Sequence, residues 1–533
     1  MTRRRILSIV FLSIILIPIT AVLYHRLTAA LSRLKTSSIH MANPNSPPVV
    51  VVGAGLAGLS AAYSALQAGA PSVRLLERAA KPGGNSIKAS SGINGAPTRF
   101  QNAAKYGVDH SFWDDTVRSA GSRLQASVAE PIRAHREGLI STLTNHSASA
   151  IDFLVDLGVD LTVVAQLGGH SKPRTHRGAG KTPPGAAIIT TLLAKLTQDH
   201  PDRFALVTEA EVTRLLTTPH NNHITGVEYH HPNTPDSPPQ TLHTPTVIFT
   251  TGGFAGDTAG LLSTHRPDLG GLPSTNDPRP GAHSILSAIG VRLVDMESVQ
   301  IHPTGFVDPT NIGSHVKFLA AEMLRGEGGV LLSKGKRVVN ELGTREEVSR
   351  VLMDLPQTTG EEEGGLRQWD VQVVLDGGVV EAAAGHVGFY LWKGLLKKVK
   401  VRELDETTRQ TLREYAAVVR GEKKDEFGRV AFGHWRLGVD GEDLDEEAEV
   451  CVGRVTPIVH FTMGGAVFNE QAQVLASELG EEERPIGGLW AAGEITGGIH
   501  GDNRLGGSSL LECVVFGRIA GEQAAQAVLR AGV

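Results

Sequence analysis

The chain contains little cysteine. Its 533 residues include two, Cys451 and Cys513, which lie far apart and form neither a CxxC nor a CxxCH pattern. This spacing argues against a disulfide-rich scaffold, a zinc knuckle, a cysteine-ligated iron–sulfur cluster and covalently attached c-type haem. We expect two buried free thiols, with a pairing of the two as the alternative.

The chain also lacks a strong charge of either sign and is poor in aromatic residues. The net charge is −5 and aromatic residues make up 5% of the sequence. Without a basic field, nucleic acid is not an expected partner. No cluster of metal-ligating residues is evident, so we expect no metal. The length predicts about two to four structural units.

The first 46 residues contain no acidic residue. Three arginines precede an almost uniformly apolar stretch from Ile6 to Tyr24. This pattern predicts an N-terminal hydrophobic helix that serves as a membrane anchor or targeting segment, followed by a linker. Endoplasmic reticulum and mitochondrion both remain open, and a start at Met41 predicts a shorter cytosolic form.

The first clear folding signal is a β-branched run followed by a glycine-rich turn. Residues 49–52 are all valine, and the sequence GAGLAG follows at 53–58. This pattern predicts a buried strand, a tight turn and a helix whose N-terminus faces a pyrophosphate. Glu77 follows the next predicted strand, where an acid binds a ribose hydroxyl. The predicted dinucleotide-binding residues here are Gly53, Gly55, Ala57, Gly58 and Glu77.

More glycine-rich turns follow at intervals along the chain. Apolar runs at 204–208, 226–229, 246–251 and 488–492 predict further strands of a doubly wound sheet. Ligands bind at the carboxyl ends of such strands. We therefore expect these turns, and the start of the last helix, to contribute further cofactor-binding residues: Gly84, Asn85, Ser86, Ser91, Gly92, Gly252, Gly253, Glu494, Ser508 and Leu510.

The composition changes in the middle of the chain. Residues 297–461 carry charge runs and helical patterns, with few apolar strands that end in glycine. We predict an α/β fold in which a Rossmann-like domain, 47–296 and 462–533, receives an inserted α+β capping domain, 297–461. The N-terminal hydrophobic helix, within 1–46, precedes both domains.

Two segments before this insertion need a structural interpretation. Apolar residues at helical spacing predict one helix from Leu139 to Leu157. Residues 166–181 form a basic loop rich in glycine and histidine, which includes His170, Arg174, His176 and Arg177. This loop is either solvated or a gate over a site, and we favour the solvated loop.

Histidine and arginine recur beside glycine on both sides of the predicted insertion. The segments are QIHPTG at 300–305, AEMLRGEGG at 321–329, ELGTR at 341–345, HFTMGG at 460–465 and HGDNRLGG at 500–507. Arginine offers planar, bidentate geometry for carboxylates. The pattern therefore predicts an anionic substrate held at a domain boundary.

Together these motifs resemble the FAD-dependent fumarate reductases. The ordered set is GAGLAG, GGNS, SSGIN, TTGGF, HPTGF, AExxRGEGG, NELGTRE, HFTMGG, AAGE and GDNRLGGSS. The family includes single-chain relatives of the succinate dehydrogenase flavoproteins and the flavin part of flavocytochrome c. The resemblance extends from about residue 47 to the C-terminus.

The resemblance implies bound FAD and a capping domain that closes over fumarate. FAD N5 would deliver a hydride to fumarate, and Arg345 would donate the proton that completes succinate. Glu322 and Arg325 would supply protons to Arg345. His302, His460 and Arg504 would bind the substrate carboxylates.

Some features depart from the family pattern. Ala321 stands where some bacterial members carry a hydroxyl group, and SSGIN lacks the histidine that binds FAD covalently in succinate dehydrogenases. We therefore expect non-covalent FAD. Without a haem motif, electrons must come from a reduced flavin, a protein or another donor. The alternatives are a flavoenzyme for another carboxylate, such as a urocanate reductase or aspartate oxidase, and a non-catalytic membrane-tethered flavoprotein.

Overall fold

The computed structural model describes residues 47–531, except 181, 220–222, 234–237, 359–364 and 442. The expected N-terminal hydrophobic helix lies outside these residues. Among the helices that the structure describes, none has the length and hydrophobicity to cross a membrane. Cys451 and Cys513 are both buried and free, which confirms that prediction.

A six-stranded sheet forms the centre of the nucleotide-binding part. All four residues of β1 (Val49–Val52) are buried. Five strands run parallel, and β20 pairs antiparallel at one edge. The spatial order is β20 (Gln473–Leu475), β21 (Pro485–Ala491), β10 (Val247–Phe249), β1, β2 (Val73–Leu76) and β6 (Phe204–Val207).

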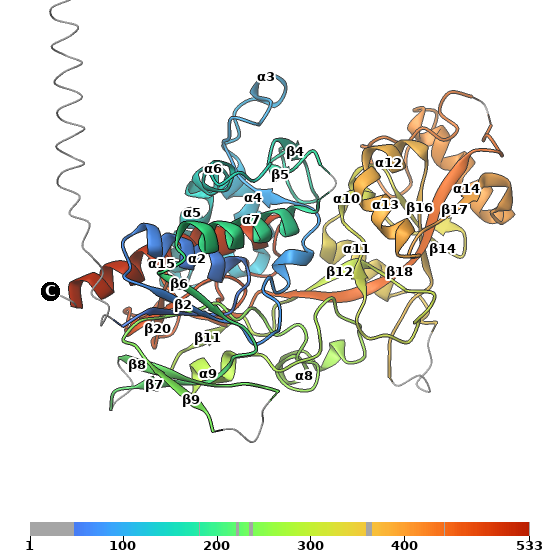
Figure 1. Cartoon of the computed structure of the whole chain (residues 1–533). Helices are drawn as coiled ribbons and strands as arrows, with labels where there is room; N and C mark the ends of the chain where they lie inside the picture. Colours follow the sequence, from blue (N-terminus) through green and yellow to red (C-terminus); the bar gives the residue numbers. More distant parts are fainter. Residues whose placement is uncertain are drawn as a thin grey trace, which may run out of the picture. The chain divides into compact units, whose positions relative to one another are not determined.

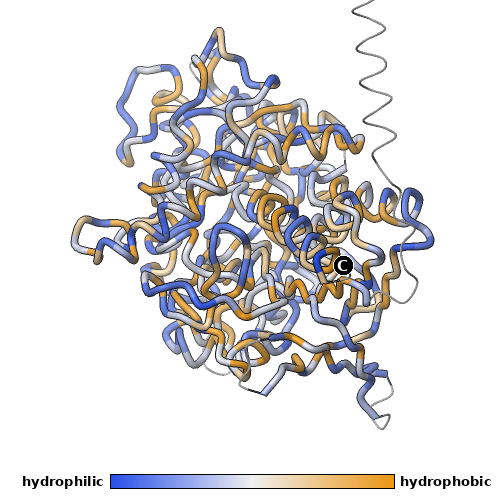
Figure 2. Tube along the Cα trace, turned by 90° about the vertical axis from the view of Figure 1, so that its left-hand side faces the viewer, coloured by the Kyte–Doolittle hydropathy of each residue, from blue (hydrophilic) through white to orange (hydrophobic). Residues whose placement is uncertain are grey.

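Helices cover one face of this sheet and a second small sheet covers the other (Figure 1). The covering helices are α2 (Leu56–Gln67), α5 (Glu130–Asn145), α6 (Ser147–Asp156), α7 (Pro184–Asp199) and α15 (Ser508–Ala531). The small sheet is β7 (Glu211–Thr217), β8 (Ile224–His230) and β9 (Gln240–His243). Hydrophobic residues run through the interior of this arrangement (Figure 2).

Two predictions for this part are wrong in detail. Residues 226–229 lie in β8, which pairs antiparallel with β7 and β9 outside the parallel sheet. The connections on either side of β8, residues 218–223 and 231–239, are too short for the crossover that parallel pairing needs, so the three strands pair antiparallel. The predicted helix at 139–157 is two helices. The break is at His146, where the buried Ser147 hydroxyl donates to main-chain oxygens of Thr144 and Ala96.

Helices α2 and α15 pack in direct backbone contact. A Cβ at Gly517 would lie 2.7 Å from the carbonyl oxygen of Ala57, and one at Gly521 would lie 2.2 Å from that of Ala61. Only glycine permits this approach. The C-terminal helix therefore lies directly on the helix that follows the first glycine-rich turn.

A seven-stranded antiparallel sheet forms the second part, with its own hydrophobic core. Its strands are β12 (Val299–Phe306), β13 (Phe318–Leu319), β14 (Val330–Ser333), β15 (Lys336–Arg337), β16 (Val371–Leu375), β17 (Lys397–Lys400) and β18 (Glu449–Thr462). The accompanying helices are α10 (Met323–Gly326), α11 (Arg345–Met353), α12 (Gly377–Ala382), α13 (Ala384–Trp392) and α14 (Glu406–Val419). The domain boundaries at 297 and 461 stay a prediction.

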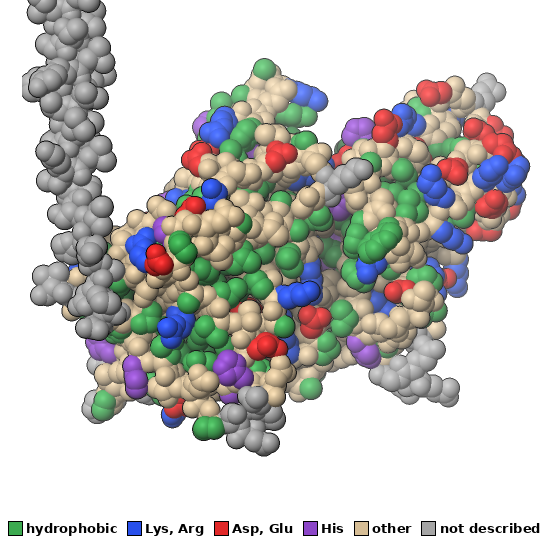
Figure 3. Space-filling model, in the orientation of Figure 1, with side chains coloured by type: hydrophobic (Ala, Val, Ile, Leu, Met, Phe, Trp, Pro, Cys, Tyr) green, Lys and Arg blue, Asp and Glu red, His purple; other side chains and the backbone are tan. Residues whose placement is uncertain are grey.

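The charged segment at 397–405 lies on the surface of this second part, whereas the acidic run at 361–363 lies outside the described residues. Acidic and basic side chains gather there around α14 and β17 (Figure 3). Lys400 Nζ lies 2.7 Å from Glu447, and Arg413 Nε lies 2.9 Å from Asp443. Such exposed pairs contribute little to stability.

Smaller elements complete the described chain. A three-stranded sheet has the order β3 (Ile93–Asn94), β5 (Thr175–Arg177), β4 (Val163–Ala165), and β11 (Leu293–Val294) pairs with β19 (Gly465–Ala466). The short helices are α3 (Ala103–Tyr106), α4 (Phe112–Ser119), α8 (Leu261–His265) and α9 (His283–Ser287).

Candidate active site

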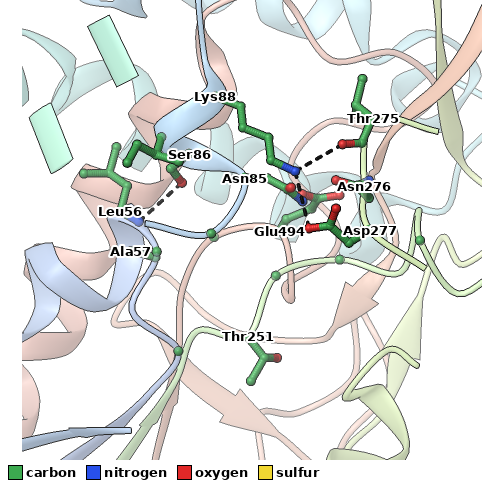
Figure 4. A pocket seen from close by; sticks show the side chains of 18 of the residues that line it. Leu56, Ala57, Asn85, Ser86, Lys88, Thr251, Thr275, Asn276, Asp277 and Glu494 are labelled. Atoms are coloured by element: carbon green, nitrogen blue, oxygen red, sulfur yellow. Dashed lines mark hydrogen bonds and ion pairs between the residues drawn. The ribbon is translucent and has the colours of Figure 1, made fainter. Parts of the chain in front are cut away.

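A cavity of about 830 Å³ opens at the carboxyl end of β1, beside the N-terminus of α2. At the turn between them, Gly53 has a φ of +103°, and a Cβ there would lie 2.5 Å from the carbonyl oxygen of Thr250. Only glycine fits this position. The first amide of α2, at Leu56, donates to the Ser86 hydroxyl at 3.3 Å (Figure 4).

Most predicted cofactor-binding residues line this cavity. They are Gly53, Gly55, Ala57, Glu77, Gly84, Asn85, Ser86, Gly252, Gly253, Glu494 and Leu510. Gly58, Ser91, Gly92 and Ser508 are described but do not belong to its lining. A Cβ at Gly58 would lie 1.9 Å from the Gly53 carbonyl oxygen, so this glycine permits close packing of the turn and α2. The Ser508 hydroxyl accepts from Asn94 at 3.0 Å.

Glu77 is held in place by backbone amides. Its Oε2 accepts from Ala54 N–H and its Oε1 from Ala79 N–H, both at 2.8 Å. The carboxylate is 7% exposed and faces the cavity. Each carboxylate oxygen can accept a further hydrogen bond, so Glu77 can bind a ribose hydroxyl as predicted.

Other polar groups in the wall also suit a cofactor. The hydroxyl oxygens of Ser90 and Thr251 are buried with no hydrogen-bond partner among the described residues, and both residues line the cavity. Lys88, also in the lining, bonds the Thr275 carbonyl at 3.3 Å and pairs with Asp277 at 3.6 Å (Figure 4). A glycine turn, a ribose-binding acid and unsatisfied hydroxyls together fit FAD.

Glu494 is the buried acid of this cavity. Its Oε1 accepts from the Thr462 amide at 2.9 Å. Burial, with a contribution from nearby Glu512, raises the pKa of Glu494 to about 7. The side chain is therefore about half protonated at neutral pH, and it can donate to or accept from a polar cofactor group.

The Glu494→Gln substitution is expected to flatten the pH dependence of stability. Folding raises the pKa of Glu494 above its ordinary 4.5, so its stabilising contribution is complete below pH 4.5 and is lost as pH rises through about 7. In the FAD-free wild type, the free energy of unfolding should fall more steeply from pH 5 to 8 than in the variant. The difference should reach about 3 kcal/mol.

Denaturant unfolding at each pH measures this difference in the free energy of unfolding. Exposed Glu470→Gln is the control, and parallel curves for E494Q and wild type would contradict the assignment.

The predicted substrate residues form a second, buried group. His302 lies on β12 and His460 on β18, while Arg345 is the first residue of α11. Arg504 lies in the turn before α15, and Glu322 immediately precedes α10. The structure thus brings together residues separated by up to 202 positions. Of the group, His460 also lines the cofactor cavity.

Gln300 connects the two arginines of this group. Its Oε1 accepts from Arg345 Nη1 at 2.9 Å and from Arg504 Nη2 at 3.0 Å. Its amide nitrogen donates to Asn503 Oδ1 and to the Arg504 carbonyl. Gln300 is the first residue of the QIHPTG segment at 300–305, but only the structure shows that it positions both arginines.

Arg345 is also bound by a carboxylate. Glu322 Oε2 accepts from Arg345 Nε at 2.8 Å and from Nη2 at 2.5 Å. Burial raises the pKa of Glu322, but Arg345 and Arg325 outweigh it and lower the value to about 2. Glu322 therefore stays ionised. It compensates the unfavourable position of a cation at the N-terminus of α11.

Both histidines are neutral. Burial, reinforced by nearby arginines, lowers the pKa of His302 and of His460 far below 6.5. His302 Nδ1 lies 3.1 Å from the Thr304 carbonyl oxygen and 3.2 Å from the Thr304 amide nitrogen, so it can either donate to the first or accept from the second. Within the described part of the chain, His302 Nε2 is buried without a partner. This ring nitrogen is therefore available to a ligand, as a donor when it carries the ring proton.

The group carries a net positive charge. Burial lowers the pKa of Arg504 to about 9 and that of Arg325 to about 10, so both stay charged at pH 7. With Arg325 counted beside Arg345 and Arg504, three guanidinium groups and the Glu322 carboxylate give these four residues a formal net charge of +2. The Nε atoms of Arg504 and Arg325 are buried and have no partner among the described residues. Such a group suits a dianion that supplies the missing acceptors.

The side chain of Arg325 bonds Glu341 rather than Glu322. Its Nη1 donates to the Glu341 carbonyl at 2.6 Å, whereas no hydrogen bond joins its side chain to that of Glu322 within the described chain. Transfer of a proton between these two side chains would require an intervening water. Ala321 is buried and supplies no side-chain donor.

The basic loop at 166–181 is not a solvated loop. His170, Arg174 and His176 are buried, with exposed fractions of 6%, 0% and 0%. The amide of Gly168 in this loop donates to Glu322 Oε1 at 3.1 Å. The sequence does not reveal this contact, because a backbone amide has no residue signature.

Comparisons with known proteins agree with this geometry. Residues 48–510 match the family described as FAD binding domain. The chain is 40% identical to a fumarate reductase of Schizosaccharomyces pombe, with 94% of each covered. It is also 40% identical to fumarate reductase 1 of Saccharomyces cerevisiae, covering 90% of this chain and 98% of that protein. The open conformation of a flavocytochrome c3 fumarate reductase has 28% identity and a TM-score of 0.68, covering 93% and 81%.

Proposed function

Because the chain belongs to the family of FAD-binding fumarate reductases, we propose that it is an FAD-dependent oxidoreductase that reduces fumarate to succinate. The observation that carries this proposal is the buried group with a net charge of +2 beside the FAD-type cavity. Fumarate is a planar dianion whose carboxylates can accept from two atoms that lack a partner among the described residues, Arg504 Nε and, with the ring proton on it, His302 Nε2.

The residues of the buried group have two roles, substrate binding and proton donation. Bound FAD supplies the hydride. Arg504 and the two neutral histidines bind the carboxylates and stabilise the negative charge that develops on the substrate. Arg345 donates the proton, and Glu322 with Gln300 holds its guanidinium in place.

We further propose that 297–461 is a capping domain. The antiparallel sheet from β12 to β18 has its own core and carries His302 and His460, and helix α11 beside it carries Arg345. Arg504 comes from the FAD-binding part. Closing the capping domain over this arginine would complete the site and exclude water from it.

The test is to reduce the purified full-length protein anaerobically and follow its flavin absorbance after adding an acceptor. Fumarate should reoxidise the flavin rapidly with formation of succinate, whereas urocanate and oxaloacetate should not. Reoxidation by oxygen but not by fumarate would overturn the proposal in favour of an oxidase. Because the sequence has no haem motif, we propose a reduced flavin or a protein as donor, and turnover with free reduced FMN tests the first.

We also propose that residues 1–46 anchor or target the protein to the endoplasmic reticulum or mitochondrion, with a cytosolic form from Met41. The arginine-flanked apolar segment supports this proposal. Fractionation combined with N-terminal sequencing tests it. Recovery of the full-length protein from the cytosol alone would contradict it.

A further inference from the structure

The hairpin formed by β4, β5 and the loop between them contacts both ends of α10. Glu322 immediately precedes this short helix and Glu327 immediately follows it. The Gly168 amide donates to Glu322 Oε1 at 3.1 Å, and Arg177 Nη2 lies 3.1 Å from Glu327 Oε1. Both side chains of the second pair are largely buried, at 13% and 17% exposure. One hairpin of the FAD-binding part thus holds the turn that carries Glu322.

Buried ion pairs hold this loop in place. Arg174 is fully buried, and its Nε and Nη2 bond Asp109 at 2.8 and 3.0 Å. Its Nη1 bonds Asp115 Oδ2 at 2.5 Å. The Ser171 amide donates to the same Asp115 oxygen at 2.8 Å. Buried charged hydrogen bonds therefore hold the loop on the C-terminal side of Gly168.

His170 links the loop to the substrate-binding turn. Arg174 Nη1 donates to His170 Nδ1 at 2.9 Å, so the ring proton lies on Nε2 and is donated to the Gly506 carbonyl at 3.0 Å. Burial and the Arg174 charge lower the pKa of His170 to about 4, which keeps the ring neutral. Gly506 lies two residues after Arg504. The loop is thus fixed relative to both Glu322 and Arg504.

We propose that the loop 166–174 is a positioning element for the proton donor, acting through the Gly168 amide on Glu322. One carboxylate oxygen, Oε1, is fixed by Gly168, while the other, Oε2, holds Arg345. Fixing the first oxygen sets the plane of the carboxylate and so aims the guanidinium at the substrate. The inference rests on the proposed proton donation by Arg345.

The Gly168→Ala substitution tests this inference with little risk to folding. Gly168 does not adopt a left-handed φ, and an added Cβ would lie 3.0 Å from Glu322 Oε1 and 3.4 Å from the Gly343 carbonyl oxygen. The carboxylate must therefore shift by a few tenths of an ångström. Gly180→Ala is the matched control, because Gly180 is an exposed glycine of the same segment with open space around its Cβ position.

We expect G168A to lower kcat for fumarate reduction about 10-fold, with KM within about twofold and FAD content unchanged. The solvent deuterium isotope effect on kcat should rise, because proton transfer becomes more rate-limiting. In a Glu322→Gln background, G168A should have little further effect, since the shared partner is already altered.

Three results would overturn the inference. G168A could behave like G180A, it could raise KM and lower FAD content with no change in the isotope effect, or its effect could persist in full in the E322Q background. Wild-type protein that forms no succinate in the same assay would instead refute the proposed function, and the inference with it.

Discussion

Arg345→Lys is expected to slow fumarate reduction by about 100-fold or more, while FAD remains bound. A positioned general acid typically contributes about 10²- to 10⁴-fold to a rate. Lysine cannot reproduce the planar contacts by which Arg345 bonds Glu322 and Gln300 together. The single-turnover rate of flavin reoxidation by fumarate measures the effect directly.

Arg350→Lys is the matched control for this experiment. Arg350 lies on the same helix, α11, but is exposed. It should retain the wild-type rate. If R345K reoxidised as fast as R350K with equal FAD content, Arg345 would not be the proton donor.

Arg504→Met should abolish tight substrate binding. Arg504 is 2% exposed, and its guanidinium lies 4.3 Å from the centre of the Phe461 ring. Methionine fills much of the same apolar space but removes the charge and the donors. Removing one partner of a buried charged interaction costs about 2–5 kcal/mol, so kcat/KM should fall by roughly 10²- to 10³-fold.

The comparison of KM with kcat separates binding from proton transfer. R504M should show a raised KM and weaker inhibition by succinate, whereas R345K should mainly lower kcat. Exposed Arg530→Met, on α15, should leave both constants unchanged. Unchanged KM and succinate inhibition in R504M would show that another cation binds the carboxylates.

The centre of the fold could be predicted from the sequence because its signals are local. Four consecutive valines and a glycine turn define β1 and the start of α2 whatever surrounds them. Residues 226–229 have the same apolar character, but their sheet depends on neighbours in β7 and β9 that periodicity does not reveal. The break at His146 depends on a buried contact between Ser147 and Ala96, distant in the chain.

In the site, too, local motifs could be predicted from the sequence and contacts between distant residues could not. Recognisable motifs contain His302, Arg345, His460 and Arg504. The structure brings these side chains together, with His460 half-buried and the other three buried. The role of Gln300 depends on both arginines reaching one oxygen. Gly168 acts through its main-chain amide, which has no signature in the sequence. The charges around Arg174 predict a solvated loop, whereas Arg174 is buried because it pairs with Asp109 and Asp115.

The glycine contact between α2 and α15 has a consequence for biosynthesis. The helix at the start of the nucleotide-binding part is covered by the last helix of the chain, and β21, near the C-terminus, completes the parallel order beside β10. Leu510 and Glu494, from the same late segment, line the cofactor cavity. The cavity is therefore incomplete until residues 485–510 have been synthesised and have folded against the first strands, so complete binding of the cofactor depends on this late segment.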